Sequence, residues 1–270
     1  MEDRLCKQEE YRGYTIKVLF DYDPQSPREW DNLGTIYSNS RRYDPDKHSL
    51  GEILNDEETG FSEDFKKNYI WLKIRGYEHS GLTISVSGGY PYNDPWDSGL
   101  FGVIAMSKED AIKNWGKKIC TKKVREKALE HLEAEVETLD QYYTGDVYGY
   151  VIENEDGDEI DSCWGYFGYE WIDKEMIPEC KAIIDNDIRK REEKHCERIE
   201  KVKSNIILLI GCTFIDGSNA YRVTNTPLFS MPMIEKATQV KGMIRDNFYN
   251  EVKLSDVPED VLENMVSVIK

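Results

Sequence analysis

The chain has 270 residues, of which 39% are hydrophobic and 11% aromatic, and its net charge is −17. The 17 tyrosines and 6 tryptophans exclude a disordered chain, because disorder requires a sequence poor in aromatic residues. The longest apolar run, 206–210, is far shorter than the ~20 residues that cross a bilayer, and the acidic start does not resemble a signal peptide, so we expect a cytoplasmic protein without a membrane partner.

Residues 1–172 predict an acidic α+β domain with a mostly antiparallel sheet and flanking helices. Segments rich in β-branched and aromatic residues predict strands at 14–22, 33–37, 69–74, 82–87, 100–106, 147–153 and 159–164. The Asp156-Gly157 pair between the last two strands predicts a hairpin. Residues 62–68 predict a helical turn, and Ser107 caps a short helix with Asp110 at the capping-box position.

A longer helix begins after Thr121, which is a good N-cap residue. Apolar residues recur along it at helical spacing and form one stripe: Val124, Ala128, Leu132, Val136 and Leu139. Charged residues occupy its other face, which we expect to lie in solvent.

From residue 173 the pattern changes to a long connector helix, 173–204, whose centre at 189–194 is polar on every side. Residues 205–270 predict a small ββαα module. It has strands at 205–214 and 220–224, a helical segment at 233–249, and a last helix after Pro258 with Asp256 as its cap. Its methionines and apolar residues, including Phe229, Met231 and Met243, suit a contact with a second protomer, so we expect homo-oligomerisation or a second contact through 205–270.

The acidity is concentrated in the first part of the chain. Residues 1–170 hold 35 acidic against 20 basic residues, whereas residues 201–270 hold 8 of each. Ten acidic residues lie between Asp140 and Asp173 without one Lys or Arg. Such a face repels a phosphate backbone and attracts a basic surface, so we expect no direct contact with nucleic acid there.

Enzymatic and metal-binding motifs are absent from the sequence. The four histidines form no HxH, HxxxH or HExxH pair, and there is no GxSxG elbow or phosphate-binding glycine loop. Six widely spaced cysteines without a CxxC pair indicate reduced thiols, and Cys163 is expected to be a small core residue. We therefore expect no enzyme, no cofactor and no metal. One alternative is a metal-dependent hydrolase of a nucleotide or nucleic acid, with Asp21, Asp23, Asp94, Asp97 and Asp146 around a cation.

Several irregular segments combine large aromatic residues with Asp and Asn. Residues 26–32, 90–99 and 140–146 are the clearest examples. A loop of this composition is either locked by hydrogen bonds, with Trp30 and Trp96 covering the ends of the sheet, or used for contact. The predicted partner-binding residues are Trp30, Trp96, Asp97, Tyr142, Tyr143, Asp146, Glu153, Glu155, Asp156, Asp158 and Glu159.

The same segments carry a family resemblance. In order they are SPREWDN (26–32), RRY (41–43), HSG (79–81), PWDSG (95–99), Trp115-Gly116, DQYYTGDVYGY (140–150) and DSCWGYFGYE (161–170). This series, over roughly residues 14–170, resembles a widespread group of acidic proteins encoded by phages, prophages and plasmids. The resemblance implies no catalytic residues.

Similar small acidic proteins of mobile elements often block host defence, including CRISPR effectors and restriction enzymes. The resemblance therefore implies an inhibitor in the host-cell cytosol that binds a host defence protein or ribonucleoprotein complex. Acidic and aromatic residues of 1–170 would form the contact face, acting as a DNA mimic in one version. A structural or assembly protein is the second alternative, and it predicts a regular oligomer.

Overall fold

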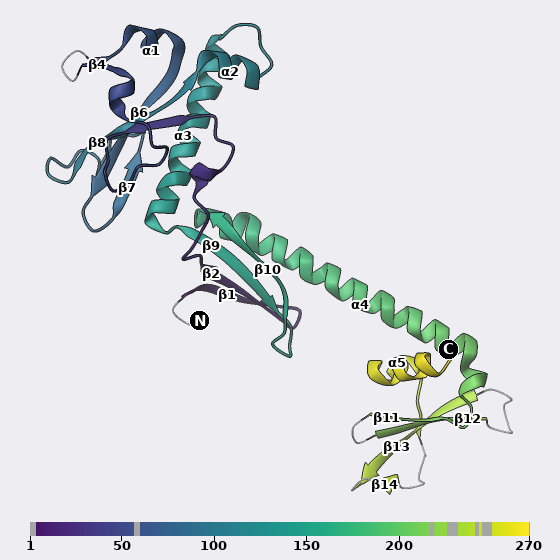
Figure 1. Cartoon of the computed structure of the whole chain (residues 1–270). Coiled ribbons are helices and arrows are strands. Elements are labelled where there is room, and N and C mark those ends of the chain that lie inside the picture. The colour runs from purple at the N-terminus through teal and green to yellow at the C-terminus, as the bar shows by residue number, and fades with distance from the viewer. Residues whose placement is uncertain are drawn as a thin grey trace. The chain divides into compact units, whose positions relative to one another are not determined.

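The structure, a computed structural model, describes residues 4–56, 60–216, 219–225, 232–240, 243–244 and 250–269. The chain divides into two compact units, Met1–Lys181 and Ala182–Lys270, and the division falls inside the long helix α4 (Ile177–Asn205). Helices flank antiparallel sheets in the ribbon (Figure 1), so the predicted α+β class is confirmed. The expected domain borders at residues 172 and 204 stay predictions.

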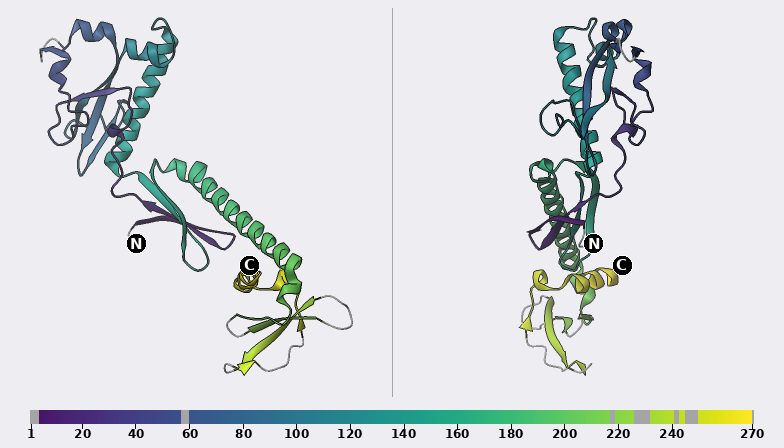
Figure 2. Two further views of the ribbon diagram at one scale, coloured as in Figure 1. Left: turned by 45° about the vertical axis from the view of Figure 1, so that its right-hand side comes forward. Right: turned by 90° about the vertical axis from the view of Figure 1, so that its left-hand side faces the viewer.

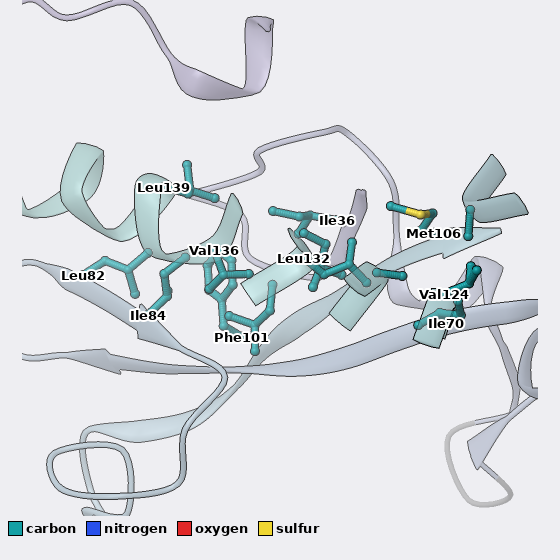
Figure 3. Close-up of a cluster of buried hydrophobic side chains, with 14 residues drawn as sticks. Ile36, Ile70, Leu82, Ile84, Phe101, Met106, Val124, Leu132, Val136 and Leu139 are labelled. Atoms are coloured by element: carbon teal, nitrogen blue, oxygen red, sulfur yellow. The ribbon is translucent and has the colours of Figure 1, made fainter. Parts of the chain in front are cut away.

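One sheet of the first unit has the strand order β3-β8-β6-β7. Its strands are β3 (Thr35–Ser38), β6 (Tyr69–Glu78), β7 (Leu82–Ser85) and β8 (Ser98–Ser107). Helix α3 (Lys122–Thr144) lies along one face of this sheet (Figure 1). The predicted apolar stripe of α3 is at most 2% exposed throughout and meets Ile70, Ile84 and Phe101 of the sheet (Figure 3). Burying a leucine such as Leu132 contributes about 1.5–3 kcal/mol, so this contact stabilises the unit.

Short elements form a second core against Val103 and Ala105 of β8. They are the 3-10 helix Leu50–Glu52, the two-stranded sheet of β4 (Leu54–Asp56) and β5 (Gly60–Phe61), and helix α1 (Glu63–Asn68). The sheet is thus covered on both faces.

The predicted capped helix at Ser107 is α2 (Lys108–Asn114), with Ser107 Oγ accepting from the backbone N–H of Asp110 at 3.0 Å.

The second sheet of this unit has the order β1-β2-β9-β10 and is antiparallel throughout. Its strands are β1 (Leu5–Tyr11), β2 (Tyr14–Phe20), β9 (Val147–Glu153) and β10 (Glu159–Phe167). The predicted hairpin joins β9 to β10, with Gly157 at φ 82 and Asn154 Oδ1 accepting from Asp156 and Asp158. β1 was not predicted, because its sequence LCKQEEY is polar and it pairs on one edge only.

The start of the long helix is tied to this second sheet. A π-helical turn, Ile172–Met176, precedes α4, so α-helical geometry begins four residues later than predicted. Lys181 pairs with Glu9 of β1 at 2.5 Å, and Tyr166 of β10 donates to Glu179 at 2.8 Å. Further along, residues 189–194 are all exposed, as the polar pattern predicts.

Besides the rest of α4, the second unit contains a small sheet and one shorter helix that covers it (Figure 2). Its elements are the 3-10 helix Ile206–Leu209, β11 (Thr213–Asp216), β12 (Asn219–Asn225), β13 (Pro232–Val240), β14 (Met243–Ile244), β15 (Asn250–Glu251), the 3-10 helix Leu254–Asp256 and α5 (Glu259–Val268). Phe214 and Tyr221 of the sheet are buried with Val261, Leu262 and Met265 of α5.

Three details predicted for this unit are wrong. Residues 233–240 form a strand, because all seven residues of β12 pair with β13 and Ile234 is buried there. The remainder of that predicted helix, apart from β14, lies outside the described residues, as do Phe229 and Met231. Residues 206–209 form a 3-10 helix that buries Leu209, so the strand begins only at Thr213. Pro258 is the N-cap of α5, and Asp256 accepts from Ser255 Oγ at 3.1 Å.

Candidate partner-binding site

Arg28 of the SPREWDN segment lies in a buried ion network, with its side chain 5% exposed. Its Nε and Nη2 donate to the two carboxylate oxygens of Asp46 at 2.8 and 2.7 Å, and its Nη1 donates to Glu135 Oε2 at 2.8 Å. Glu135 Oε1 also accepts from the backbone N–H groups of Leu33 and Gly34 at 2.9 and 3.0 Å. The network therefore fastens residues 26–34 to α3.

Trp30 belongs to this locked segment, which we call the Trp30 loop (residues 26–34). Asn32 Nδ2 donates to the carbonyl oxygens of Pro27 and Trp30 at 2.8 and 3.1 Å. The indole is 45% exposed and meets Phe167 edge-to-face, with ring centroids 5.2 Å apart at 86°. Such a pair stabilises the fold, so Trp30 has a packing role within the first unit.

The connection from β7 to β8, residues 86–97, carries Trp96, and we call it the Trp96 loop. Asp94 Oδ1 accepts from the backbone N–H groups of Trp96 and Asp97 at 2.8 and 3.0 Å. These two hydrogen bonds, the one from Asp97 first, hold the pKa of Asp94 below its usual value. The hydroxyl of Tyr92 donates to the carbonyl oxygen of Ile84 at 3.2 Å. The loop backbone is therefore fixed by its own side chains.

Large aromatic side chains of the same loop remain in solvent. Trp96 is 90% exposed, the highest fraction among large hydrophobic side chains in the described part of the chain. Tyr90 is 81% exposed, and Leu100 at the start of β8 is 56% exposed. An exposed indole on a fixed backbone loses little conformational entropy on binding, so this arrangement suits an anchor in an interface.

Charged groups from three of the motif segments meet beside the Trp96 loop. His79 Nδ1 lies 2.8 Å from Asp97 Oδ2, and Arg42 Nη1 lies 3.5 Å from Glu78 Oε1. Next to them is a hollow of about 400 Å³, whose lining includes Glu78, Asp97 and Leu100. The RRY, HSG and PWDSG segments are far apart in the sequence and lie close together in the structure.

The prediction that 140–146 is an irregular segment is wrong, because residues 140–144 form the last turn of α3. Asp140 Oδ1 accepts from Thr83 Oγ1 and from the backbone N–H of Ile84, each at 2.7 Å. Burial raises the pKa of Asp140 above its usual value, against the opposing effect of these hydrogen bonds. Tyr142 and Tyr143 are half-buried against the core of α3, and burial also raises the pKa of Tyr143.

Lysines from elsewhere in the first unit neutralise part of the acidic run 140–173. Glu153 pairs with Lys17 at 2.6 Å, and Asp173 pairs with Lys7. Both lysines come from the β1–β2 hairpin, whose pairing with β9 could not be inferred from the run itself.

Other acidic residues of the run lie beside tyrosine hydroxyls. Tyr150 donates to Asp161 at 2.9 Å, and burial together with the nearby Asp146 carboxylate raises the pKa of Tyr148. The members that remain exposed at the end of the β9–β10 hairpin are Glu155, Asp156, Asp158 and Glu159, which we call the acidic hairpin tip. The predicted acidic face is therefore narrower than the sequence suggests.

The DSCWG segment brings Trp164 onto Gly149 of β9. A Cβ at Gly149 would lie 2.4 Å from the indole ring, so only glycine leaves room for it there. Trp164 is 43% exposed. Cys163 beside it is exposed, so its prediction as a core residue is wrong: it occupies an outward position on the edge strand β10.

The described residues contain no group of three or more His, Cys, Asp or Glu side chains that could hold a metal ion. Asp94 and Asp97, two of the residues in the metal-site alternative, are instead engaged with backbone N–H groups and with His79. None of the helices in the described ranges is both long and apolar enough to cross a membrane.

The predicted partner-binding residues thus occupy separate places. Trp96 and Asp97 lie at the hollow, Glu155 and its neighbours at the acidic hairpin tip, and Trp30 against Phe167. Sequence reasoning missed Glu78 and Leu100 as site residues, although Leu100 directly follows the PWDSG segment. No protein-family model, curated protein or solved structure matches the chain.

Proposed function

We propose that the chain is a mobile-element inhibitor of a bacterial defence system and acts by binding a host immune protein complex, such as a CRISPR effector or a restriction enzyme. The observation that carries the proposal is the Trp96 loop, where a 90% exposed indole stands on a backbone fixed by Asp94. Exposing a tryptophan to solvent is unfavourable, and a buried tryptophan often contributes a large share of the binding free energy of an interface.

The acidic hairpin tip supports the same function through electrostatic attraction. Four exposed carboxylates lie within five residues at the end of β9 and β10. A basic nucleic-acid channel on the partner would be attracted to this tip, which raises the association rate more than the final affinity. The tip therefore selects basic partners, and Trp96 anchors them.

The test is affinity capture from a bacterial lysate, followed by mass spectrometry, at low and high salt. We expect a defence complex to be captured and its activity to fall on addition of the purified chain. The joint change Glu155→Gln, Asp156→Asn, Asp158→Asn and Glu159→Gln should weaken capture at low salt and remove most of its salt dependence.

A control of equal charge change replaces four exposed glutamates of α3, Glu126, Glu130, Glu133 and Glu137, by glutamine. Capture by this control should match the unchanged chain. The proposal is contradicted if no defence protein is recovered, or if the recovered complex keeps full activity with the chain bound. Equal weakening by both sets of substitutions would remove the specific role of the hairpin tip.

A further inference from the structure

Two glycines on neighbouring strands line the hollow beside the Trp96 loop. Gly76 of β6 and Gly99 of β8 are directly opposite each other in the sheet. A Cβ at Gly76 would lie 3.2 Å from Phe101 and 3.5 Å from Leu82, whereas a Cβ at Gly99 would have no heavy atom within 4 Å. The open space therefore lies above Gly99, where an ordinary side chain would fill it.

Two acidic residues line the hollow beside these glycines. Glu78 shares a face of β6 with Gly76, because side chains two residues apart on a strand do so, and Asp97 directly precedes β8. The backbone N–H of Glu78 donates to the carbonyl oxygen of Asp97 at 2.9 Å, so the two acidic residues are neighbours across the strands. The end of the hollow is therefore negatively charged.

The walls of the hollow are partly apolar. Leu82, Leu100 and Phe101 contribute the apolar part, and Leu100 is 56% exposed. Asn39 and Ser40 contribute polar groups. A cavity with an apolar wall and two acidic residues in its lining matches a side chain with an aliphatic stem and a cationic head. It does not suit a nucleic-acid strand, whose phosphates the carboxylates would repel.

Side chains of the chain itself already lie at both carboxylates. Arg42 reaches Glu78 at 3.5 Å with its side chain 74% exposed, and His79 contacts Asp97 with its side chain 69% exposed. Contacts this exposed add little to stability, so an incoming cation can displace them. Arg42 also shows that a guanidinium can approach Glu78 from solvent.

We propose that this hollow accepts an arginine side chain presented by the partner protein. Arginine is favoured over lysine because its planar guanidinium can donate to both carboxylates at once. Trp96 directly precedes Asp97, so the arginine site and the aromatic anchor form one contact surface. The nature of the partner rests on the proposed function, whereas the arginine site itself is testable without any partner.

The experiment is an NMR titration of the full-length ¹⁵N-labelled chain with N-acetyl-arginine-methylamide. We expect saturable shifts of the Gly76 and Gly99 amides with a Kd of roughly 1–10 mM, as is usual for one residue in an open site. The citrulline analogue, which has the same shape without the charge, should bind at least about ten-fold more weakly, and the lysine analogue several-fold more weakly.

Two variants separate charge from shape. Glu78→Gln with Asp97→Asn should weaken arginine binding by about ten-fold or more, and Gly99→Leu should abolish it by filling the hollow. The matched control, Glu63→Gln with Asp64→Asn on α1, makes the same charge change away from the hollow and should leave the Kd within about two-fold.

The arginine site is overturned if neither glycine amide shifts at about 50 mM ligand, if citrulline binds equally well, or if the control weakens binding as much as the site variant. Arginine binding without capture of a defence complex would refute the proposed function and leave the site standing. Capture of a defence complex without arginine binding would refute the arginine site and leave the proposed function standing.

Discussion

The Trp30 loop and the Trp96 loop have similar compositions but different structural roles. Both place a tryptophan among Asp, Asn and Pro residues. The Trp30 loop is held by the buried side chain of Arg28, which donates to Glu135, 107 residues further along the chain. The indole of Trp30 packs on Phe167. The Trp96 loop is held by contacts within a few residues of Asp94, and its indole is almost fully in solvent.

From this difference we infer that the Trp30 loop serves the fold, and we propose that the Trp96 loop serves contact. A loop that fastens distant elements stabilises the whole unit, so its loss should appear as a loss of stability. A loop that is rigid by itself can present a side chain to a partner with little effect on the core. Stability and binding measurements on matched variants of the two loops therefore test whether the distinction is correct.

The largest effect is expected for Arg28→Met. Removing the guanidinium leaves Asp46 and Glu135 as buried charges without their cation, which costs about 3–5 kcal/mol of unfolding free energy. Urea denaturation followed by tryptophan fluorescence measures this loss. Arg42→Met, at an exposed ion pair, is the control and should change stability by less than about 1 kcal/mol. A loss below about 1 kcal/mol for Arg28→Met would show that the network does not hold the loop.

A smaller effect is expected for Trp30→Ala. Loss of the edge-to-face contact with Phe167 and of the half-buried ring area should cost about 1–2 kcal/mol. Trp96→Ala should change the unfolding free energy by less than about 0.5 kcal/mol, because its side chain is 90% exposed. Equal losses at the two positions would remove the basis for giving the loops different roles.

Asp94→Ala should loosen the Trp96 loop without unfolding the unit. The backbone N–H groups of Trp96 and Asp97 lose their acceptor, so their hydrogen exchange should accelerate roughly five-fold. Amides of α3 serve as the internal reference and should keep their exchange rates. Unchanged exchange at Trp96 and Asp97 would mean that the loop is fixed by something other than Asp94.

The smallest effect concerns pH, and it has opposite signs at Asp94 and Asp140. The pKa of Asp94 is lowered in the folded chain, so its charged carboxylate stabilises the fold. This stabilisation is fully present above the pKa of Asp94 in the unfolded chain and is lost as the pH falls through its pKa in the folded chain. The pKa of Asp140 is raised by burial, so its charged carboxylate lowers the unfolding free energy at neutral pH. This loss of stability is recovered as the pH falls through the pKa that Asp140 has in the folded chain.

Unfolding free energies measured from pH 7 to pH 3 on Asp94→Asn and Asp140→Asn would separate the two contributions. Relative to the unchanged chain, Asp94→Asn should lose less stability on acidification, because the lowered pKa is gone. Asp140→Asn should lose more stability than the unchanged chain on acidification, because it has no buried carboxylate whose protonation stabilises the fold. Changes of the same sign for both variants would contradict the environments that the structure gives to these two carboxylates.

Local patterns in the sequence predict a large part of the fold. The α3 stripe from Val124 to Leu139 follows helical periodicity and is buried as expected. Asp156-Gly157 predicts the β9–β10 hairpin, because only a few residues decide a tight turn. The strand β13 could not be predicted in this way: its residues favour a helix in isolation, and pairing with β12 overrides that preference.

The site is less predictable because its members are distant in sequence. Trp96 and Asp97 are among the predicted residues, but Glu78 reaches Asp97 only through the pairing of β6 with the start of β8. Likewise, the acidic run 140–173 has no Lys or Arg of its own, yet Lys7 and Lys17 pair with two of its members. A single sequence contains all of these residues but does not show which of them pair in the fold.

We expect Trp96 to serve binding and not folding. The measurement is the affinity of the Trp96→Ala variant for the captured defence complex. The control is Ile119→Ala, which truncates another exposed apolar side chain of the same unit (67% exposed). We expect at least about a ten-fold loss of affinity for Trp96→Ala and less than about a two-fold change for Ile119→Ala, with the unfolding free energy unchanged in both. Equal affinity of the two variants, or a loss of affinity that follows a loss of stability, would contradict the claim.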